Sequence, residues 1–272
     1  MSIYYEKTYQ RCFGTFPLKG KVLFDAIQHA SNIGYRAYDT AQMYENEMQT
    51  GEALEATGIK RSNLCLATKV HPDNFSDQRF IDSVEESLKA LRTDYVDVLL
   101  LHWPPIGGDI APSLKLLEKA KNIGLARNIG VSNYTAKMMY DAKEIIETPL
   151  VTNQIEFHPL LNQDVLLNAS VETGIPLSSY CSLARGEVFK YPIFSKIGEK
   201  YDKSPAQVIL SWILHKGVSV NTMSTNPKNI EENFNILNFT LNNIDINNIE
   251  KMKDTGFRIV GEDLVPWAPE WD

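Results

Sequence analysis

The feature that most constrains the fold is a repeated unit, in which a short β-branched apolar run is followed by an amphipathic segment of helical period. Strands and helices that alternate in this way predict parallel βαβ units. The runs are nearly continuously apolar, as expected for strands buried on both faces. Strands are predicted at residues 12–15, 36–39, 64–70, 95–102, 126–132, 151–157, 176–181 and 218–222.

Helices are predicted at residues 21–33, 45–57, 77–91, 112–123, 135–146, 164–173, 205–216 and 230–237. Ser76-Asp77, Asn133 and Ser204-Pro205 are start signals for three of them. Eight such units in 272 residues favour an α/β fold of the (β/α)8 TIM-barrel type, with residues 1–272 forming one domain. A doubly wound sheet is the rival, but the G-x-G-x-x-G turn that favours it is absent after the first strand.

Charge and hydropathy exclude several classes of partner. The chain has 27 Lys+Arg against 34 Asp+Glu, a net charge of −7, and a negative chain binds nucleic acid poorly. It has no basic run longer than two residues and no apolar run that approaches the ~18 residues of a transmembrane helix. We therefore expect neither a nucleic-acid nor a membrane partner.

The cysteine pattern favours a reducing compartment. Cys12, Cys65 and Cys181 are odd in number and lack the spacing of a metal site or a disulfide framework. Cys65 and Cys181 are interpreted as small buried core residues. His158 has no second ligand at suitable spacing, so no metal site is predicted. The N-terminal segment lacks the order of a signal peptide, and we expect a cytoplasmic monomer.

Polar residues interrupt the apolar runs where the predicted strands end. In a barrel, the chemistry is located at the carboxyl ends of the strands. Taken singly, these residues could be helix caps, solvated strand ends or core residues, but in a barrel they converge on one axial pocket. A Lys and an Asp buried there would pair, because an unpaired buried charge costs several kcal/mol. The residues are Asp39, Tyr44, Lys69, His102, Ser132, Asn133, Gln154 and Tyr180.

This set of side chains suits the reduction of a carbonyl group by an external hydride. A phenol has an ordinary pKa of ~10, too high for efficient proton donation near neutrality. A nearby ammonium favours the phenolate and is expected to lower that pKa, while a carboxylate keeps the ammonium charged. An imidazole can orient the carbonyl oxygen by hydrogen bonding.

Seven motifs follow one another in a distinctive order and spacing. They are GTF at 14–16, GYRAYDTAQMYENE at 34–47, TKV at 68–70, LHWP at 101–104, IGVSN at 129–133, NQIEFHP at 153–159 and IEEN at 230–233. By these motifs the chain resembles the aldo-keto reductase superfamily over essentially its whole length. It is most similar to the short bacterial branch that contains the 2,5-diketo-D-gluconate reductase B enzymes.

The resemblance implies a catalytic tetrad of Asp39, Tyr44, Lys69 and His102, with Tyr44 as the general acid. It also implies an extended NADPH site. Ser132, Asn133 and Gln154, here called the amide layer, would hold the nicotinamide carboxamide, and Tyr180 would stack on the ring. The implied cofactor residues are Gly14, Thr15, Asp39, Ser132, Asn133, Gln154, Tyr180, Leu183, Arg185, Ser224, Thr225, Lys228, Glu232 and Asn233. For the substrate, Phe16, Met43, Phe75 and Trp103 are expected to line the pocket, and Trp267 and Trp271 to close it.

Two departures from the family pattern concern the 2′-phosphate of NADPH. Met223 and Asn229 stand where many members have a Lys and an Arg, which are the usual partners of a dianionic phosphate. NADPH is the expected cofactor, with NADH as the alternative and a weak preference between them. The expected substrates are small carbonyl compounds such as methylglyoxal, β-keto esters or 2,5-diketo-D-gluconate.

Two other functions compete with carbonyl reduction. The chain could be a barrel that binds the dinucleotide and senses redox state with little or no turnover. It could also be a Schiff-base enzyme that uses Lys69 as the nucleophile. That chemistry needs a Lys of depressed pKa, whereas a neighbouring Asp39 would raise it.

Overall fold

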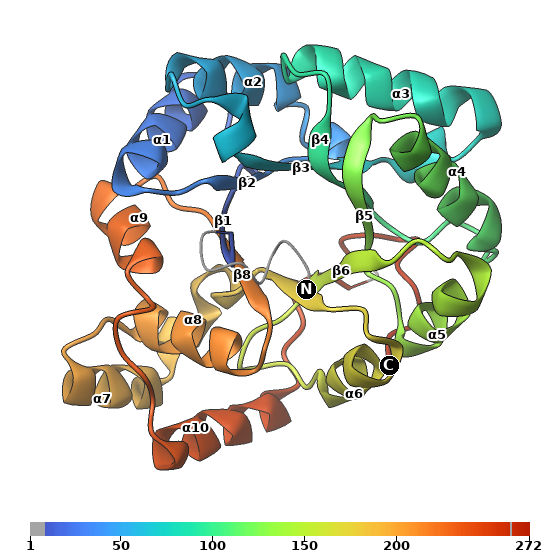
Figure 1. Ribbon diagram of the computed structural model, residues 1–272. Coiled ribbons are helices and arrows are strands. Elements are labelled where there is room, and N and C mark those ends of the chain that lie inside the picture. The colour runs from blue at the N-terminus through green and yellow to red at the C-terminus, as the bar shows by residue number, and fades with distance from the viewer. Residues whose placement is uncertain (1–8, 262) are drawn as a thin grey trace.

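The eight predicted strands close into a parallel barrel, so the predicted TIM barrel is confirmed. A computed structural model describes residues 9–261 and 263–272. Each strand pairs with the next in the chain, and β8 closes the barrel on β1. Figure 1 looks down the barrel, with the strands around the centre and the helices outside. The strands are β1 (Arg11–Gly14), β2 (Ala37–Asp39), β3 (Cys65–Val70), β4 (Val96–Leu101), β5 (Ala126–Ser132), β6 (Leu150–Glu156), β7 (Leu177–Tyr180) and β8 (Ser219–Thr222).

The helices surround the barrel, and two of them were not predicted from the sequence. These two, α7 and α10, are short and lie outside the regular alternation of strand and helix. The described helices are α1 (Gly20–Ile33), α2 (Glu47–Ala56), α3 (Asp77–Ala90), α4 (Ala111–Asn122), α5 (Ala136–Ile145), α6 (Asp164–Thr173), α7 (Pro192–Tyr201), α8 (Pro205–His215), α9 (Pro227–Phe234) and α10 (Asn243–Glu250). Across residues 9–261 and 263–272, no helix combines the length and apolarity needed to cross a bilayer.

Capping residues explain where the structure departs from the predicted helix limits. The predicted helix at 230–237 begins earlier, at Pro227, because the Asn226 side chain accepts a hydrogen bond from the next turn. Asn133 was wrongly predicted to begin α5, since Thr135 accepts from the Met138 amide instead. The start signal at Ser204 is confirmed by a full capping box.

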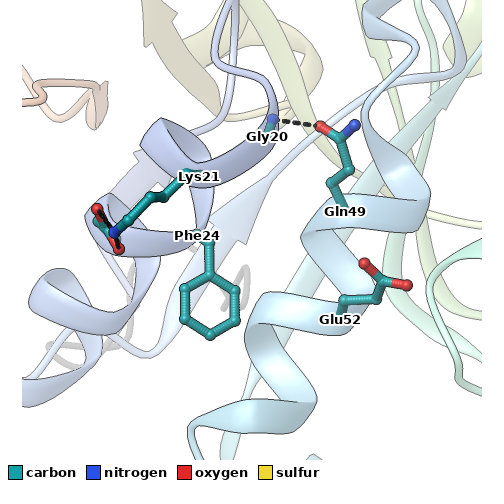
Figure 2. Close-up of a pocket in the computed structure, with 6 residues that line it drawn as sticks. Gly20, Lys21, Phe24, Gln49 and Glu52 are labelled. Carbon is teal, nitrogen blue, oxygen red and sulfur yellow. Dashed lines mark hydrogen bonds and ion pairs between the residues drawn. The ribbon is translucent and has the colours of Figure 1, made fainter.

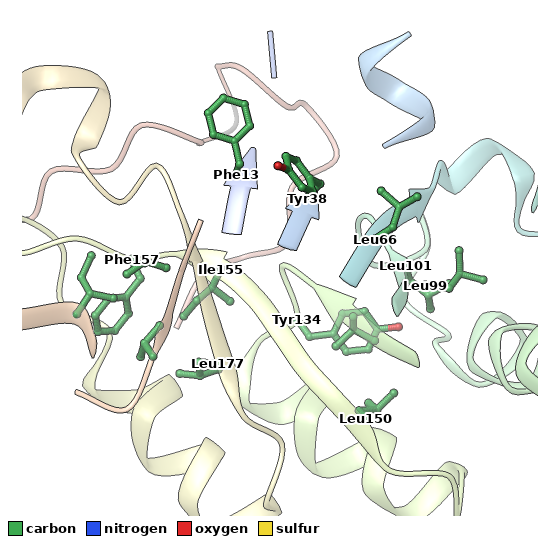
Figure 3. Packing of buried hydrophobic residues seen from close by; sticks show 14 of the residues in the cluster. Phe13, Tyr38, Leu66, Leu99, Leu101, Tyr134, Leu150, Ile155, Phe157 and Leu177 are labelled. Carbon is green, nitrogen blue, oxygen red and sulfur yellow. The ribbon is translucent and has the colours of Figure 1, made fainter. Parts of the chain in front are cut away.

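The side chains of each strand alternate between the helices and the barrel axis. In β4, Leu99 and Leu101 belong to the large cluster that packs against the helices, whereas Val98 and Leu100 belong to a second cluster. Figure 3 shows part of the large cluster, with side chains from several strands gathered in one apolar layer. The alternation follows from the two-residue period of a strand.

The interior of the barrel changes from apolar to polar along the strands. The second cluster consists of small or aliphatic residues: Cys12, Ala37, Cys65, Ala67, Val98 and Leu100. Two residues further along their strands lie Asp39, Lys69 and His102, all buried. Because strand residues two apart share a face, these polar groups also point to the axis, above the apolar residues of β1 to β4.

Candidate active site

A buried ion pair lies at the centre of the polar layer. Lys69 has no exposed surface and Asp39 is 2% exposed, and the Lys69 Nζ forms a salt bridge and hydrogen bond with Asp39 Oδ1. The same Nζ donates to the Thr40 carbonyl at 3.0 Å and to the Tyr44 hydroxyl oxygen at 3.1 Å. The three donors of the ammonium are therefore satisfied, which a buried charge requires.

The electrostatics of this group confirm one expectation and correct another. Burial alone would lower the pKa of Lys69, but Asp39 and the Tyr44 phenol raise it above its usual value, so Lys69 stays charged. This argues against a Schiff-base role. Burial raises the pKa of Tyr44 by more than the Lys69 ammonium lowers it. The expectation of a lowered Tyr44 pKa is therefore wrong for the protein without ligands, because desolvation of a phenolate outweighs one ammonium.

His102 completes the predicted tetrad as a neutral imidazole. Its ring meets the Tyr44 ring edge-on, with 5.4 Å between centroids. Burial, with a contribution from the Lys69 charge, holds the pKa of His102 well below its ordinary value. The buried Nδ1 has no hydrogen-bond partner in the described part of the chain. His102 is therefore suited to hydrogen bonding with a bound oxygen and unsuited to supplying a proton.

Hydrogen bonds join the predicted amide layer to the tetrad. Gln154 Nε2 donates to Asp39 Oδ2 at 3.0 Å, a link that the sequence did not predict. Asn133 Nδ2 donates to the His102 carbonyl at 3.0 Å, and its Oδ1 accepts from the Tyr180 hydroxyl at 2.7 Å. The Ser132 hydroxyl donates to the backbone of Gln154 at 2.8 Å. The ends of β5, β6 and β7 thus bring these residues together beside the ion pair.

Most of the remaining predicted cofactor residues lie beyond β7 and β8. Lys228 is exposed and paired with Glu232 at 3.7 Å, and Asn233 is buried. Arg185 is exposed, and its charge offsets part of the rise that burial causes in the pKa of the Cys181 thiol. Cys181 is half-buried with φ of +49°, so its interpretation as a buried core residue is wrong.

Four further predicted cofactor residues differ in what they offer a ligand. Leu183 and Ser224 are half-buried, and Thr225 is exposed. The Thr15 side chain is fully buried and faces Asn46, so its hydroxyl is engaged within the protein.

Gly14 and Asn221 show a feature that fits an extended ligand. A Cβ on Gly14 would lie 2.8 Å from the Oδ1 of Asn221, so a larger residue here would displace the Asn221 side chain. That Oδ1 is buried and has no hydrogen-bond partner among the described residues. With the amide layer on one side and the start of α9 on the other, the donors and acceptors present fit a nicotinamide dinucleotide laid across the barrel mouth.

Aromatic side chains form the predicted substrate wall only in part. Phe16 lies 5.1 Å from the Tyr44 ring, and Trp103 stacks near His102 at 6.5 Å. Phe75 packs instead against a residue of α3, at 6.1 Å from Phe80.

The other predicted pocket aromatics come from the C-terminal tail. Trp271 lies 6.2 Å from Trp103, which places the tail against the predicted wall. Trp267 is 37% exposed, and Met43 is half-buried beside Tyr44 in the chain.

Sequence reasoning missed the carboxylate that holds the tail to the barrel. Glu156, at the end of β6, is 1% exposed and accepts from the Ile259 and Val260 amides at 2.7 and 2.8 Å. It also bonds the His158 ring at 2.8 Å, which supports the structural interpretation of His158. The two amide partners, Ile259 and Val260, lie about a hundred residues from Glu156 in an aperiodic segment, so no local pattern could have revealed them.

We expect Glu156→Gln to release the tail. The Gln side chain has one acceptor oxygen and no charge. The Glu156 carboxylate that it replaces has two oxygens, which bond two backbone amides and an imidazole. Loss of charge-assisted hydrogen bonds costs ~1.5–3 kcal/mol, so the free energy of unfolding should fall by about that amount. Limited proteolysis should cut the variant near residues 259–260 first. Asp164→Asn, which removes the surface partner of Lys253, is the matched control and should leave this site protected.

The same carboxylate gives this effect a pH dependence. Burial would raise the pKa of Glu156, but the hydrogen bonds from His158 and the two amides lower it overall. A lowered folded-state pKa stabilises the fold above the ordinary value of ~4.3 and loses its effect as the pH falls through the folded value. Wild type and Glu156→Gln should therefore converge in stability in acid. A constant difference down to acid pH would contradict this assignment.

A groove between α1 and α2 lies outside the barrel and contains none of the tetrad. Figure 2 shows Phe24 of α1 facing the groove, and the Gly20 amide donates to the side chain of Gln49 at 2.7 Å. Its charged residues are already paired, Lys21 with Asp25 at 2.6 Å and Glu52 with Arg92 at 2.7 Å. The convergent chemistry is therefore at the barrel mouth. In the described residues, no group of three or more His, Cys, Asp or Glu side chains could hold a metal ion.

Comparisons with known proteins identify the family of the chain. A sequence model described as the aldo/keto reductase family matches residues 12–254. The chain is 38% identical to the methylglyoxal reductase DkgB of Yersinia pestis over 262 residues, covering 95% of this chain and 97% of that protein. The Salmonella typhi protein of the same name has the same identity and coverage.

Solved structures show the same relationship. A crystal structure assigned as a 2,5-diketo-D-gluconic acid reductase B superposes with a TM-score of 0.94 at 36% identity, covering 100% of this chain and 97% of that one. An aldo/keto reductase from Brucella melitensis gives 0.86 at 34% identity, with 90% and 95% covered. Because both the sequence and the barrel match over nearly the whole chain, the chain belongs to the aldo/keto reductase family.

Proposed function

We propose that this protein is a single-domain NAD(P)H-dependent reductase of aldehydes and ketones, with Tyr44 as the proton donor. One observation carries the proposal. The Lys69 ammonium, paired with Asp39, contacts the Tyr44 hydroxyl beside a neutral imidazole at the end of the barrel. Aldo/keto reductases generally use nicotinamide cofactors. This cluster would add a proton donor and a group that orients the carbonyl oxygen.

The roles of the side chains follow from their charges. The substrate oxygen binds between the Tyr44 hydroxyl and the His102 ring, which together orient and polarise the carbonyl. The nicotinamide, when bound, supplies the hydride to the carbonyl carbon. Tyr44 gives its proton to the oxygen, and the Lys69 ammonium stabilises the phenolate that remains. Asp39 keeps Lys69 charged and in place.

The cofactor would be held by the residues that surround this cluster. Ser132, Asn133 and Gln154 offer hydroxyl and amide groups to a carboxamide, and the half-buried Tyr180 ring offers a stacking face. The hydroxyl of Tyr180 is fixed by Asn133 at 2.7 Å, which restrains the ring. We propose that the dinucleotide then extends past Gly14 towards the start of α9, where helix amides favour phosphate.

The substrates are small carbonyl compounds such as methylglyoxal, β-keto esters or 2,5-diketo-D-gluconate. The aromatic wall beside Tyr44 and His102 and the tail over Trp103 support a confined pocket. Two of the relatives are named methylglyoxal reductases, which supports the same class.

A carbonyl panel with NADPH and NADH tests the proposed function. We expect higher kcat/KM for small dicarbonyls than for a bulky steroid ketone, because aromatic rings flank the Tyr44 phenol and the His102 imidazole. Higher kcat/KM for the steroid would contradict the substrate class. Quenching of the protein fluorescence by NADPH without turnover of any carbonyl would instead favour the redox-sensing barrel.

Cofactor choice should respond to the two positions at the start of α9. Met223, just after β8, and Asn229, within α9, are both exposed, and Lys228 is the one Lys or Arg in the described segment 219–234. Loss of one charge-assisted hydrogen bond weakens a preference by ~10–100-fold, so NADPH should be favoured over NADH by a modest margin. Met223→Lys with Asn229→Arg should tighten NADPH and leave NADH almost unchanged in a fluorescence titration. Equal shifts for both cofactors would show that these positions do not face the 2′-phosphate.

A further inference from the structure

We propose that Arg258 determines substrate specificity by binding a carboxylate carried by the carbonyl substrate. The proposal rests on the proposed function, because it assigns the charge of the substrate to the same pocket. Arg258 lies in the C-terminal tail, outside every predicted motif. Three features support it: a fixed backbone, a position beside the pocket wall, and a buried donor without a partner.

The backbone on both sides of Arg258 is anchored to the barrel. The preceding amide, of Phe257, donates to the Leu160 carbonyl at 2.9 Å. The two following amides, of Ile259 and Val260, donate to the buried Glu156 carboxylate. Since Glu156 ends β6, this arrangement fixes Arg258 at the end of the barrel where the tetrad lies.

The side chain of Arg258 extends towards the proposed substrate wall. Its guanidinium carbon lies 4.3 Å from the centre of the Trp271 ring, a cation–π contact. Trp271 packs on Trp103, and Trp103 stacks near His102. Arg258 is also near enough to Tyr180 to interact with it electrostatically. One continuous layer of rings therefore connects the guanidinium to the imidazole of the tetrad.

The guanidinium has unused hydrogen-bonding capacity. Its Nη1 is buried and has no partner among the described residues. Burial lowers the pKa of Arg258 from its ordinary value, but a guanidinium in a protein remains charged. A buried donor without a partner is costly, and the cost is removed when a ligand supplies an acceptor.

The two carboxylates near Arg258 are already committed elsewhere. Glu156 accepts from His158, Ile259 and Val260, and Asp272 Oδ2 accepts from the Ala136 amide at 2.9 Å. Figure 1 accordingly marks the C-terminal end beside α5. Glu156 and Asp272 therefore balance part of the Arg258 charge but do not accept a hydrogen bond from its Nη1. The planar fork of a guanidinium fits a carboxylate with two parallel bonds, so a carbonyl compound with a second, anionic end is the matching ligand.

A pair of nearly isosteric aldehydes tests the assignment. 4-Carboxybenzaldehyde carries the anion and 4-formylbenzamide is neutral, so the ratio of their kcat/KM values isolates the charge. Wild type should prefer the acid. Arg258→Met keeps an apolar contact with Trp271 but removes the charge, and should lower the ratio by about 10–100-fold, mainly through KM of the acid. Arg258→Lys keeps the charge without the fork and should retain part of the preference.

Arg92→Met is the matched control, because Arg92 is also an arginine paired with acids but lies at the opposite end of the barrel, before β4. It should leave the ratio unchanged. An unchanged ratio in Arg258→Met, or an equal fall in Arg92→Met, would overturn the role of Arg258. Failure of wild type to reduce either aldehyde, or methylglyoxal, would instead overturn the proposed function. Reduction of the amide without preference for the acid overturns only the inference.

Discussion

Tyr44→Phe is expected to lower kcat by at least ~10²-fold, the effect of removing a general acid. The ring and its contacts with Phe16 and His102 remain, so the pocket keeps its shape. What disappears is the hydroxyl oxygen that accepts a hydrogen bond from the Lys69 ammonium at 3.1 Å. Since the proposed cofactor residues do not include Tyr44, NADPH affinity measured by fluorescence titration should stay near that of wild type.

The pH profile gives a second readout for Tyr44. A general acid works while it holds its proton, so the reduction should slow as the pH rises through the Tyr44 pKa. Burial raises that pKa above its usual ~10, and the nearby ammonium offsets only part of the rise. Reduction in wild type should therefore stay level from neutral to mildly alkaline pH. Near-normal kcat in Tyr44→Phe would refute Tyr44 as the general acid, whatever the pH profile of the wild-type enzyme.

The barrel and the convergence of its polar residues could be predicted because both follow from local periods. A strand repeats every two residues, so Cys65, Ala67 and Lys69 share one face wherever β3 lies. Lys69 is the last of these three residues, so it lies at the carboxyl end of the strand, which is the mouth of a parallel barrel. The pairing of Asp39 with Lys69 then follows from the cost of burying either charge alone.

What could not be predicted depends on contacts between distant segments. The tail has no period and no pairing signal, so the bonds from Ile259 and Val260 to Glu156 appear only in the folded chain. The direction of the Tyr44 pKa shift was also beyond the sequence. It is a balance between desolvation and one ammonium, and the degree of burial decides it.

Asp39→Asn is expected to destabilise the fold by ~3–5 kcal/mol, the cost of leaving a buried charge without its partner. Lys69 has no exposed surface through which water could replace the carboxylate. Its remaining contacts are the Thr40 carbonyl and the Tyr44 hydroxyl, neither of which carries a charge. Lys69→Met in the same chain removes the stranded ammonium, so the double variant should be more stable than Asp39→Asn alone.

The slope of stability with pH distinguishes this cause from a simple packing defect. In wild type the folded-state pKa of Lys69 is raised, so its stabilising effect is complete below the unfolded value of ~10.4 and declines as the pH rises through the folded one. Without Asp39, burial dominates and lowers that pKa. The unfolded chain then holds more protons between the folded value and ~10.4, and stability must rise with pH across that interval.

Denaturant unfolding at a series of pH values from 7 to 10 should therefore bring Asp39→Asn closer to wild type as the solution becomes alkaline. The double variant lacks the titrating ammonium and should show no such recovery, which makes it the control for the slope. A gap between Asp39→Asn and wild type that stays constant over this range would mean that Lys69 is not held charged by Asp39. The electrostatic basis of the proposed proton donor would then fail with it, because Tyr44 would lose the ammonium that stabilises its phenolate.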